Sequence, residues 1–253
     1  ASIYLTRRAP RIAQAKTVDP RAVITLVLGN RPFMALTVIY GVMTMAIALI
    51  TAGLPFGALY LIIDSGDTFL SGAARSLTTL SLMFAAFVVG AILSQAVWVA
   101  LSHALGKMGA LVLGLSLFIV LLVVLFYQLP SVDVTLIAGL FVLAGMANGA
   151  YQQIPFAMYP DLMDVTRAQS GQAIEGAFSA IWLFGQKAAN AIAPLILGGI
   201  LTAYGWVETT ETIAVQPKAA LAALQVSISL VPAGILGLAI FGLLAFYRPH
   251  RVH

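Results

Sequence analysis

The chain has no cysteine and few charged residues among its 253 positions. Without cysteine it can form no disulfide, no thiolate metal site and no cysteine nucleophile. Charged residues make up 9% of the sequence, against about 25% in soluble domains, and hydrophobic residues make up 61%. This balance excludes an ordinary soluble domain and predicts an integral membrane protein that has the lipid bilayer as a partner.

The motifs of enzyme active sites are also missing. The sequence contains no phosphate-binding GxxxxGK[ST] loop and no HExxH motif. The histidines His103, His250 and His253 fall in predicted loops or tails, and none of the acidic residues falls inside an apolar run. We therefore expect no enzyme, no catalytic residue, no metal and no cofactor. Membrane topology explains the net charge of +4 better than a nucleic-acid partner does.

Long apolar runs organise the chain. Inside lipid every backbone polar group must be hydrogen-bonded within the protein, so only helices or closed barrels can cross. The runs are continuous rather than alternating, which favours helices. Six are long enough to span a bilayer, and they lie between Arg31 and Asp64, Arg75 and His103, Lys107 and Asp133, Asp133 and Asp161, Gly176 and Val207, and Lys218 and Arg248. The predicted fold is all-α and integral to the membrane, with six transmembrane helices in residues 32–247, preceded by a basic segment, 1–31, and followed by a tail, 248–253.

The basic residues indicate the orientation in the membrane. If both termini are cytoplasmic, ten of the thirteen lysines and arginines fall on that side, and only Arg75 and Lys218 fall outside. The remaining one, Lys187, interrupts the fifth apolar run. Because cytoplasmic loops are enriched in Lys and Arg, we predict a multi-pass protein of the cell membrane with both termini in the cytoplasm.

Small and polar residues mark the fourth run. Gly145 and Gly149 have the spacing that lets helices pack closely, and a seam that slides during a conformational change is the alternative. A polar group lies just before Pro155 and consists of Asn148, Tyr151, Gln152 and Gln153. A polar group beside a helix bend suggests a cavity, and hydrogen bonding between helices is the alternative.

Lys187 is costly within the fifth run, by about 2.5–3.5 kcal/mol on insertion scales. A lysine at that depth is usually paired or faces a cavity. All nine acidic residues fall in tails and loops. We therefore expect the charged partner of Lys187 to lie outside this chain, on an N-terminal half that is missing here.

A hydrophilic turn joins the fourth and fifth runs and carries Asp161, Asp164, Arg167 and Glu175. The two aspartates are three residues apart, and they can cap backbone donors at a helix end. The alternative is a cytoplasmic latch, in which this turn contacts basic groups of another domain and so holds one access state.

Several segments, taken in order, match the pattern of a known family. They are Asn30-Arg31-Pro32-Phe33, Gly106-Lys107, Pro160-Asp161-x-x-Asp164, Gly171, Glu175-Gly176 and Lys187. Together they resemble helices seven to eleven and the connecting loops of the glycoside–pentoside–hexuronide:cation symporters, a family of the major facilitator superfamily. The chain departs from that family at Val165 and Ala168, where an aromatic residue is common.

The resemblance implies a secondary active transporter that moves a sugar or related small solute together with Na⁺ or H⁺. The family has twelve helices and this chain resembles only the last six, which implies a partner half of six helices. The central cavity would then be lined by residues of the fourth and fifth helices: Asn148, Tyr151, Gln152, Trp182, Gln186 and Lys187. Trp182 would either stack on a sugar ring or serve in packing. The alternative hypothesis is a non-transporting membrane scaffold built on the same half-fold.

Overall fold

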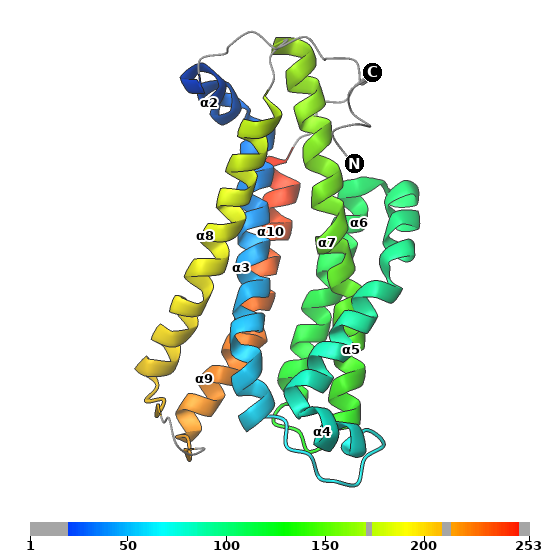
Figure 1. The fold of residues 1–253 in the computed structure, drawn as a ribbon, viewed down its shortest axis with the longest axis vertical. Coiled ribbons are helices and arrows are strands. Elements are labelled where there is room, and N and C mark those ends of the chain that lie inside the picture. The colour runs from blue at the N-terminus through cyan, green and yellow to red at the C-terminus, as the bar shows by residue number, and fades with distance from the viewer. Residues whose placement is uncertain (1–19, 171–173, 209–213, 248–253) are drawn as a thin grey trace, which may run out of the picture.

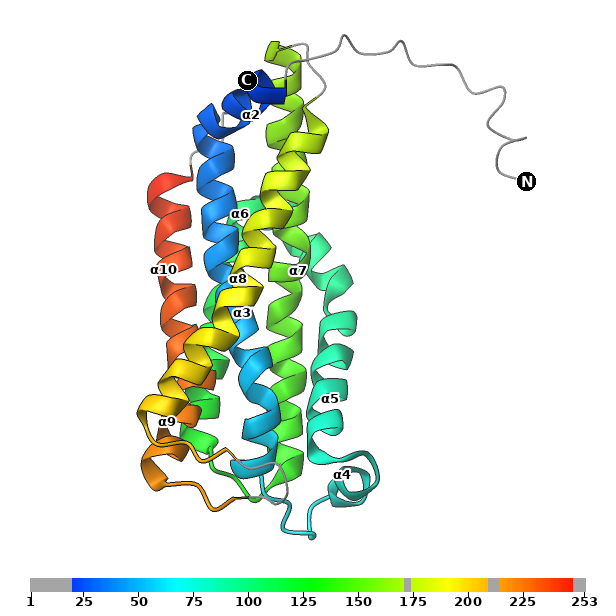
Figure 2. The same cartoon turned by 60° about the vertical axis from the view of Figure 1, so that its left-hand side comes forward.

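The computed structural model describes residues 20–170, 174–208 and 214–247, and it describes no side chains for residues 20–23 and 165–170. This part of the chain is helical apart from its loops and one isolated bridge between Ile62 and Ser131. The helices are α2 (Pro20–Gly29), α3 (Arg31–Tyr60), α4 (Ser71–Leu77), α5 (Thr79–Leu93), α6 (Gln95–Gln128), α7 (Val134–Ser170), α8 (Glu175–Ala203), α9 (Lys218–Ile228) and α10 (Leu230–Phe246). Figures 1 and 2 show an elongated bundle whose long helices run along one axis.

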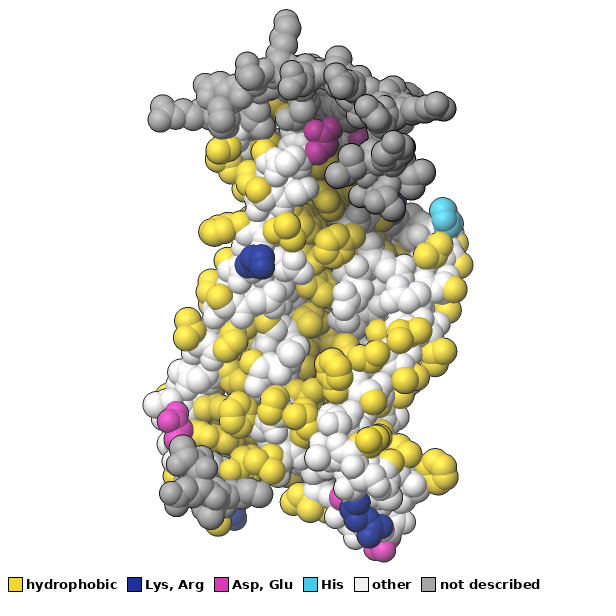
Figure 3. All heavy atoms as spheres, viewed as in Figure 1, with side chains coloured by type: hydrophobic (Ala, Val, Ile, Leu, Met, Phe, Trp, Pro, Cys, Tyr) yellow, Lys and Arg dark blue, Asp and Glu magenta, His cyan; other side chains and the backbone are white. Residues whose placement is uncertain are grey.

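The all-α membrane fold predicted from the apolar runs is confirmed. Within the described residues, five helical stretches are long and apolar enough to cross a membrane. The pair α4 and α5, whose parts make an angle of 109°, passes the same test together and adds a sixth if both belong to one span. Hydrophobic side chains cover much of the length of the bundle in Figure 3, and acidic ones lie near its ends. This distribution fits a body immersed in lipid.

Helix α6 contains a reversal of the chain at Gly106. This residue has a φ of 75°, a left-handed conformation that glycine adopts without strain. A Cβ placed on Gly114 would lie 3.1 Å from the Trp98 ring, whereas a straight helix would separate the two residues by about 24 Å. The first part of α6 therefore continues α5, and the part after Gly106 returns alongside it. These two parts correspond to the second and third predicted runs.

Glycines bring α5 and α7 into backbone contact. A Cβ on Gly145 would overlap the carbonyl group of Phe87, and one on Gly90 would overlap the carbonyl of Val142. At Gly149 an added Cβ would lie 2.7 Å from the Trp98 ring, whose Nε1 donates to Met146 O at 2.6 Å. The predicted GxxxG pair is thus a packing surface against α5 and the start of α6.

The two ends of the bundle are closed by different contacts. At one end Asn30 caps α3, because its side chain accepts a hydrogen bond from Phe33 N at 3.0 Å. At the other end Asp64 accepts hydrogen bonds from Ser71 Oγ and Gly66 N. Both bonds favour the ionised carboxylate and hold the pKa of Asp64 below its usual range, with the Ser71 bond the larger cause. Ser71 itself is 1% exposed.

The close packing of α5 on α7 generates a prediction at Gly145. We expect Gly145→Ala to destabilise the protein in detergent by about 1–3 kcal/mol, because the added methyl forces the two helices apart. Gly139→Ala, on the same helix with nothing within 4 Å of the added Cβ, is the matched control and should be neutral or slightly stabilising. Thermal unfolding of both variants measures the difference, and equal melting temperatures would contradict the packing role.

Candidate functional site

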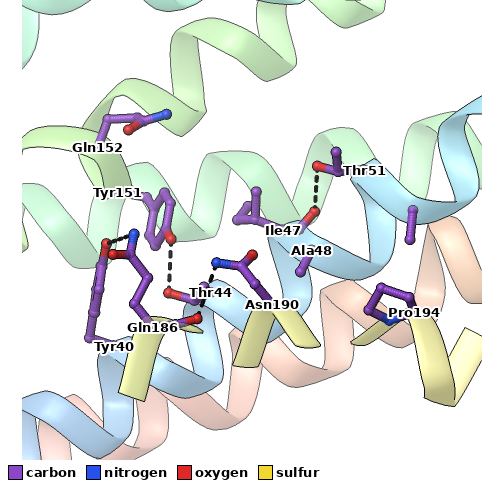
Figure 4. Close-up of a pocket in the computed structure, with 11 residues that line it drawn as sticks. Tyr40, Thr44, Ile47, Ala48, Thr51, Tyr151, Gln152, Gln186, Asn190 and Pro194 are labelled. Atoms are coloured by element: carbon purple, nitrogen blue, oxygen red, sulfur yellow. Dashed lines mark hydrogen bonds between the residues drawn. The ribbon is translucent and has the colours of Figure 1, made fainter. Parts of the chain in front are cut away.

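A polar cavity of about 350 Å³ lies between α3, α7 and α8. We call it the first lobe (Figure 4). It is lined by Tyr40, Thr44, Ile47, Ala48, Thr51, Ala52, Tyr151, Gln152, Gln186, Asn190 and Pro194. Its polar groups are hydroxyls and amides, and no lining residue is charged. Such a surface can exchange hydrogen bonds with a neutral, hydroxylated solute.

Hydrogen bonds between helices hold the wall of the first lobe. Thr44 Oγ1 on α3 and the Tyr151 hydroxyl on α7 lie 2.9 Å apart. Gln186 Nε2 on α8 donates to the Tyr40 hydroxyl at 3.1 Å. Gln152 is exposed and makes no hydrogen bond within the described residues, which leaves its amide available to a solute.

A column of aromatic rings stands behind this wall. Tyr40 stacks on Tyr151 with ring centroids 5.5 Å apart and on Trp182 with centroids 4.2 Å apart. Tyr159 stacks on Trp182 at 5.0 Å. The column joins α3, α7 and α8, because consecutive rings come from different helices. It therefore fixes the position of the Tyr40 hydroxyl that Gln186 contacts.

The column determines where Trp182 lies relative to the sequence-based expectation. Trp182 is 1% exposed, and the rings of Tyr40 and Tyr159 lie against it. It does not line the first lobe in this structure. In this structure Trp182 therefore serves in packing, and it supports the wall of the first lobe through its contact with Tyr40.

A second lobe of about 540 Å³ opens beside the first, towards α5. It shares Ile47, Thr51 and Gln152 with the first lobe. Its other lining residues are Phe84, Phe87, Val88, Ala91, Ile92, Gln95, Asn148 and Gln153. Gln153 donates to the Gln95 side chain, whereas Asn148 is buried with no hydrogen-bond partner for either amide atom within the described residues. Since the two lobes meet at Gln152, they form one continuous groove.

Lys187 lies outside the groove. Its side chain is exposed on α8, and it lines neither lobe. The span in α8 runs over Glu175–Ala203, so Lys187 is two residues from its centre, or about 3 Å along the axis. Among the described residues an ion pair joins Lys107 and Asp161, and none involves Lys187.

Two residues of the hydrophilic turn, Asp161 and Asp164, lie on helix α7. Asp161 Oδ2 pairs with Lys107 Nζ at 2.6 Å, and Lys107 also donates to Ala157 O at 2.8 Å. Because α7 continues to Ser170, Asp161 and the exposed Asp164 lie within the helix rather than at its end. The Arg167 side chain is outside the described residues.

Glu175 is the first residue of α8 and lies in its acidic first turn. A negative charge there is favourable because the exposed amide groups give the beginning of a helix a partial positive charge. At this position Glu175 stabilises the beginning of α8.

Sequence reasoning missed the contribution of α3. Six groove residues belong to α3 and follow the spacing of a single helix face: Tyr40, Thr44, Ile47, Ala48, Thr51 and Ala52. That periodicity was available in the sequence. It was hidden because threonines and a tyrosine in an otherwise apolar run also fit ordinary helix packing in a membrane.

Comparison with known proteins assigns the chain to a family. The sequence profile described as MFS/sugar transport protein matches residues 2–250. An uncharacterized symporter of Synechocystis sp. is 32% identical over 151 residues, which cover 57% of this chain and 28% of that protein. The match thus spans less than a third of that relative's length. Because the profile covers nearly the whole sequence, the chain belongs to the MFS/sugar transport family of the major facilitator superfamily.

Proposed function

We propose that this chain is the C-terminal six-helix half of a secondary active transporter of the glycoside–pentoside–hexuronide:cation symporter type. It would move a sugar or related small solute together with Na⁺ or H⁺ by alternating access in the cell membrane. Family membership supports transport in general. The observation that carries the specific proposal is the uncharged polar groove at the centre of an otherwise apolar bundle.

The depth of the groove supports transport. The span in α7 covers Val134–Asp164, so its centre is at Gly149, between the groove residues Asn148 and Gln152. In transporters built from two helical bundles, the solute binds near the middle of the membrane at the interface between the bundles, and the bundles rock around it. A half that provides one wall of such a site needs polar groups at this level.

The chemistry of the groove supports a neutral, hydroxyl-rich solute. Its lining offers amides and hydroxyls, which donate and accept hydrogen bonds without carrying charge. No lining residue of either lobe is acidic, basic or a histidine. A charged solute would need its compensating group from the opposite wall. A sugar needs only the hydrogen bonds that this wall supplies.

The surroundings of Lys187 support a partner half. A lysine ammonium near the middle of a span is unfavourable in contact with lipid, and no described acid pairs with it. An opposing bundle that carries a carboxylate would satisfy the charge. A cation that competes for the same carboxylate would then couple its own binding to the state of Lys187.

Transport by the reconstituted protein tests this proposal. We expect the chain together with an N-terminal half, encoded upstream in the same gene or in an adjacent one, to accumulate a labelled sugar in liposomes under a Na⁺ or H⁺ gradient. Lys187→Ala should abolish accumulation while leaving expression and melting temperature near wild type. Lys218→Ala, an exposed lysine at the start of α9, is the matched control.

The outcomes separate the two hypotheses. If the wild-type protein, assembled from both halves, takes up no sugar under either gradient, the membrane scaffold is favoured. If Lys187→Ala leaves uptake unchanged, the transport function stands, and the proposed role of Lys187 in cation coupling is refuted. Equilibrium exchange of the sugar should survive in Lys187→Ala, because the groove itself is intact.

The orientation can be tested by cysteine labelling, since the native sequence has no cysteine. Phe69 is 92% exposed in the connection between α3 and α4, and His103 is exposed near the reversal at Gly106. With both termini cytoplasmic, Phe69→Cys should react with an impermeant maleimide from outside. His103→Cys should react only after permeabilisation. The opposite pattern would invert the proposed topology.

The hydrophilic turn is proposed to stabilise one access state through Asp164. This side chain is exposed, whereas Asp161 already pairs with Lys107 of the same chain. We expect Asp164→Asn to change the maximal transport rate severalfold while the half-saturation concentration stays constant. Asp161→Asn serves for comparison and should cost little stability, because an exposed ion pair contributes about 0–1 kcal/mol. An unchanged rate in Asp164→Asn at equal expression would refute the latch.

A further inference from the structure

Helix α2 (Pro20–Gly29) is a short apolar helix that lines neither lobe of the groove. Its sequence is PRAVITLVLG, in which Arg21 is the one charged residue. It ends two residues before the span of α3, which begins at Arg31. Helix α2 therefore lies at the boundary of the membrane and outside the groove.

The chain breaks between α2 and α3 for local reasons. Asn30 has an extended backbone, with φ −78° and ψ 91°, and its side chain caps α3. Pro32 has no amide hydrogen, so it cannot donate to Leu28 O as a continuous helix would require. Helix α2 therefore turns away from the axis of α3 at this end of the bundle (Figures 1 and 2).

Val27 anchors α2 to the bundle. It is 0% exposed and belongs to the same core cluster as Phe33 and Ile174, and α2 contacts both α3 and α8. The spans of α3 and α8 begin at Arg31 and Glu175. A helix of 30 residues, the length of α3, extends about 45 Å and matches a bilayer with its headgroup regions. The anchor at the beginning of these spans thus holds α2 at the level of the lipid headgroups.

Two large apolar side chains of α2 are left uncovered. Ile24 is 48% exposed and Leu28 is 52% exposed. They are four residues apart and so share one face of the helix, whereas the buried Val27 points about 100° away from Leu28. A helix that lies in a membrane interface places such side chains at the boundary between headgroups and acyl chains.

Basic residues gather in the same part of the sequence. Residues 1–31 contain six lysines and arginines and one acidic residue, Asp19, whereas the rest of the chain contains seven basic and eight acidic residues. The positive charge of the protein therefore comes from this segment. Arg31 is exposed three residues after Leu28. Basic residues beside the membrane surface attract anionic lipid, and each raises the affinity about fivefold.

We propose that α2 is a docking surface for anionic phospholipid. Ile24 and Leu28 insert between the headgroups and the acyl chains, Arg31 binds lipid phosphate, and the other basic residues of segment 1–31 add to the attraction. Because α2 packs against the beginning of α8, bound lipid ties this groove-lining helix to the membrane surface. The inference concerns a partner of the chain and does not depend on the proposed transport function.

Titration with short-chain lipids tests the preference for negative charge. The full chain, in an uncharged detergent, carries an environment-sensitive fluorophore at Leu28→Cys, since the native sequence has no cysteine. We expect dioctanoyl-phosphatidylglycerol to act at a half-saturation concentration well below that of dioctanoyl-phosphatidylcholine. Arg21→Gln/Arg31→Gln should raise the phosphatidylglycerol value about 25-fold, or fivefold for each charge. Lys218→Gln, at an exposed lysine that begins α9, is the matched control and should change neither value.

Salt tests the same preference without a substitution. Raising NaCl from about 0.05 M to about 0.5 M shortens the range of electrostatic attraction. The phosphatidylglycerol value of the unsubstituted chain, labelled at Leu28→Cys, should therefore rise severalfold, while the phosphatidylcholine value stays constant.

Quenching by lipids brominated on their acyl chains tests insertion. In nanodiscs that contain phosphatidylglycerol, fluorophores at Ile24→Cys and at Leu28→Cys should lose most of their fluorescence. Asp67→Cys, in the exposed connection between α3 and α4, is the water-facing reference and should keep its fluorescence. The two leaflets of a nanodisc are equivalent, so this result does not depend on the orientation of the protein.

The contrary results are equally specific. Equal half-saturation values for the two lipids, or values that neither salt nor the double substitution changes, refute an anionic docking surface. Fluorophores at Ile24 and Leu28 that brominated lipids leave unquenched refute insertion and place this face in water or under another protein. A disulfide between two copies through Leu28→Cys in nanodiscs assigns the face to a dimer instead.

Discussion

The close contact between α5 and α7 is the constraint on which the groove depends. Gly90 and Gly145 bring the two backbones together where any side chain would overlap a carbonyl group. Without a hydrophobic driving force between helices in lipid, such contacts rely on close packing of small residues. The same contact fixes the rotation of α7. Asn148, three residues after Gly145, is thereby held at the groove instead of turning towards lipid.

A second set of interactions fixes the positions of α3 and α8 relative to α7. The aromatic column Tyr151–Tyr40–Trp182–Tyr159 alternates between helices, so each of the two central rings contacts rings from two other helices. Aromatic pairs contribute about 0.5–1.5 kcal/mol beyond burial, and the column also places the hydroxyl that Gln186 contacts. Packing and recognition are therefore not separable here: Trp182 affects the groove without lining it.

The sequence predicts the spans well and the groove only in part. Uncharged runs locate the membrane-crossing helices because the cost of charge in lipid is local and large. Gly106 marks the reversal between two runs, because glycine adopts without strain the positive φ that the chain has there. The covering of Trp182 was not predictable in this way, because it depends on Tyr40, which is far away in sequence. The bend between α4 and α5 likewise has no strong local signal, since neither glycine nor proline stands next to Thr78.

Gln186 and Lys187 show how solute and charge are separated on one helix. Adjacent helical residues point about 100° apart, and here Gln186 lines the first lobe whereas Lys187 faces away from it. In the proposed transporter a carboxylate on the opposing half attracts Lys187, and any rotation of α8 that this attraction causes also moves Gln186. The bond from Gln186 to the Tyr40 hydroxyl, 3.1 Å long, then links that rotation to the aromatic column. Coupling between cation and solute thus requires no direct contact between them, only a helix that presents an amide to one and an ammonium to the other.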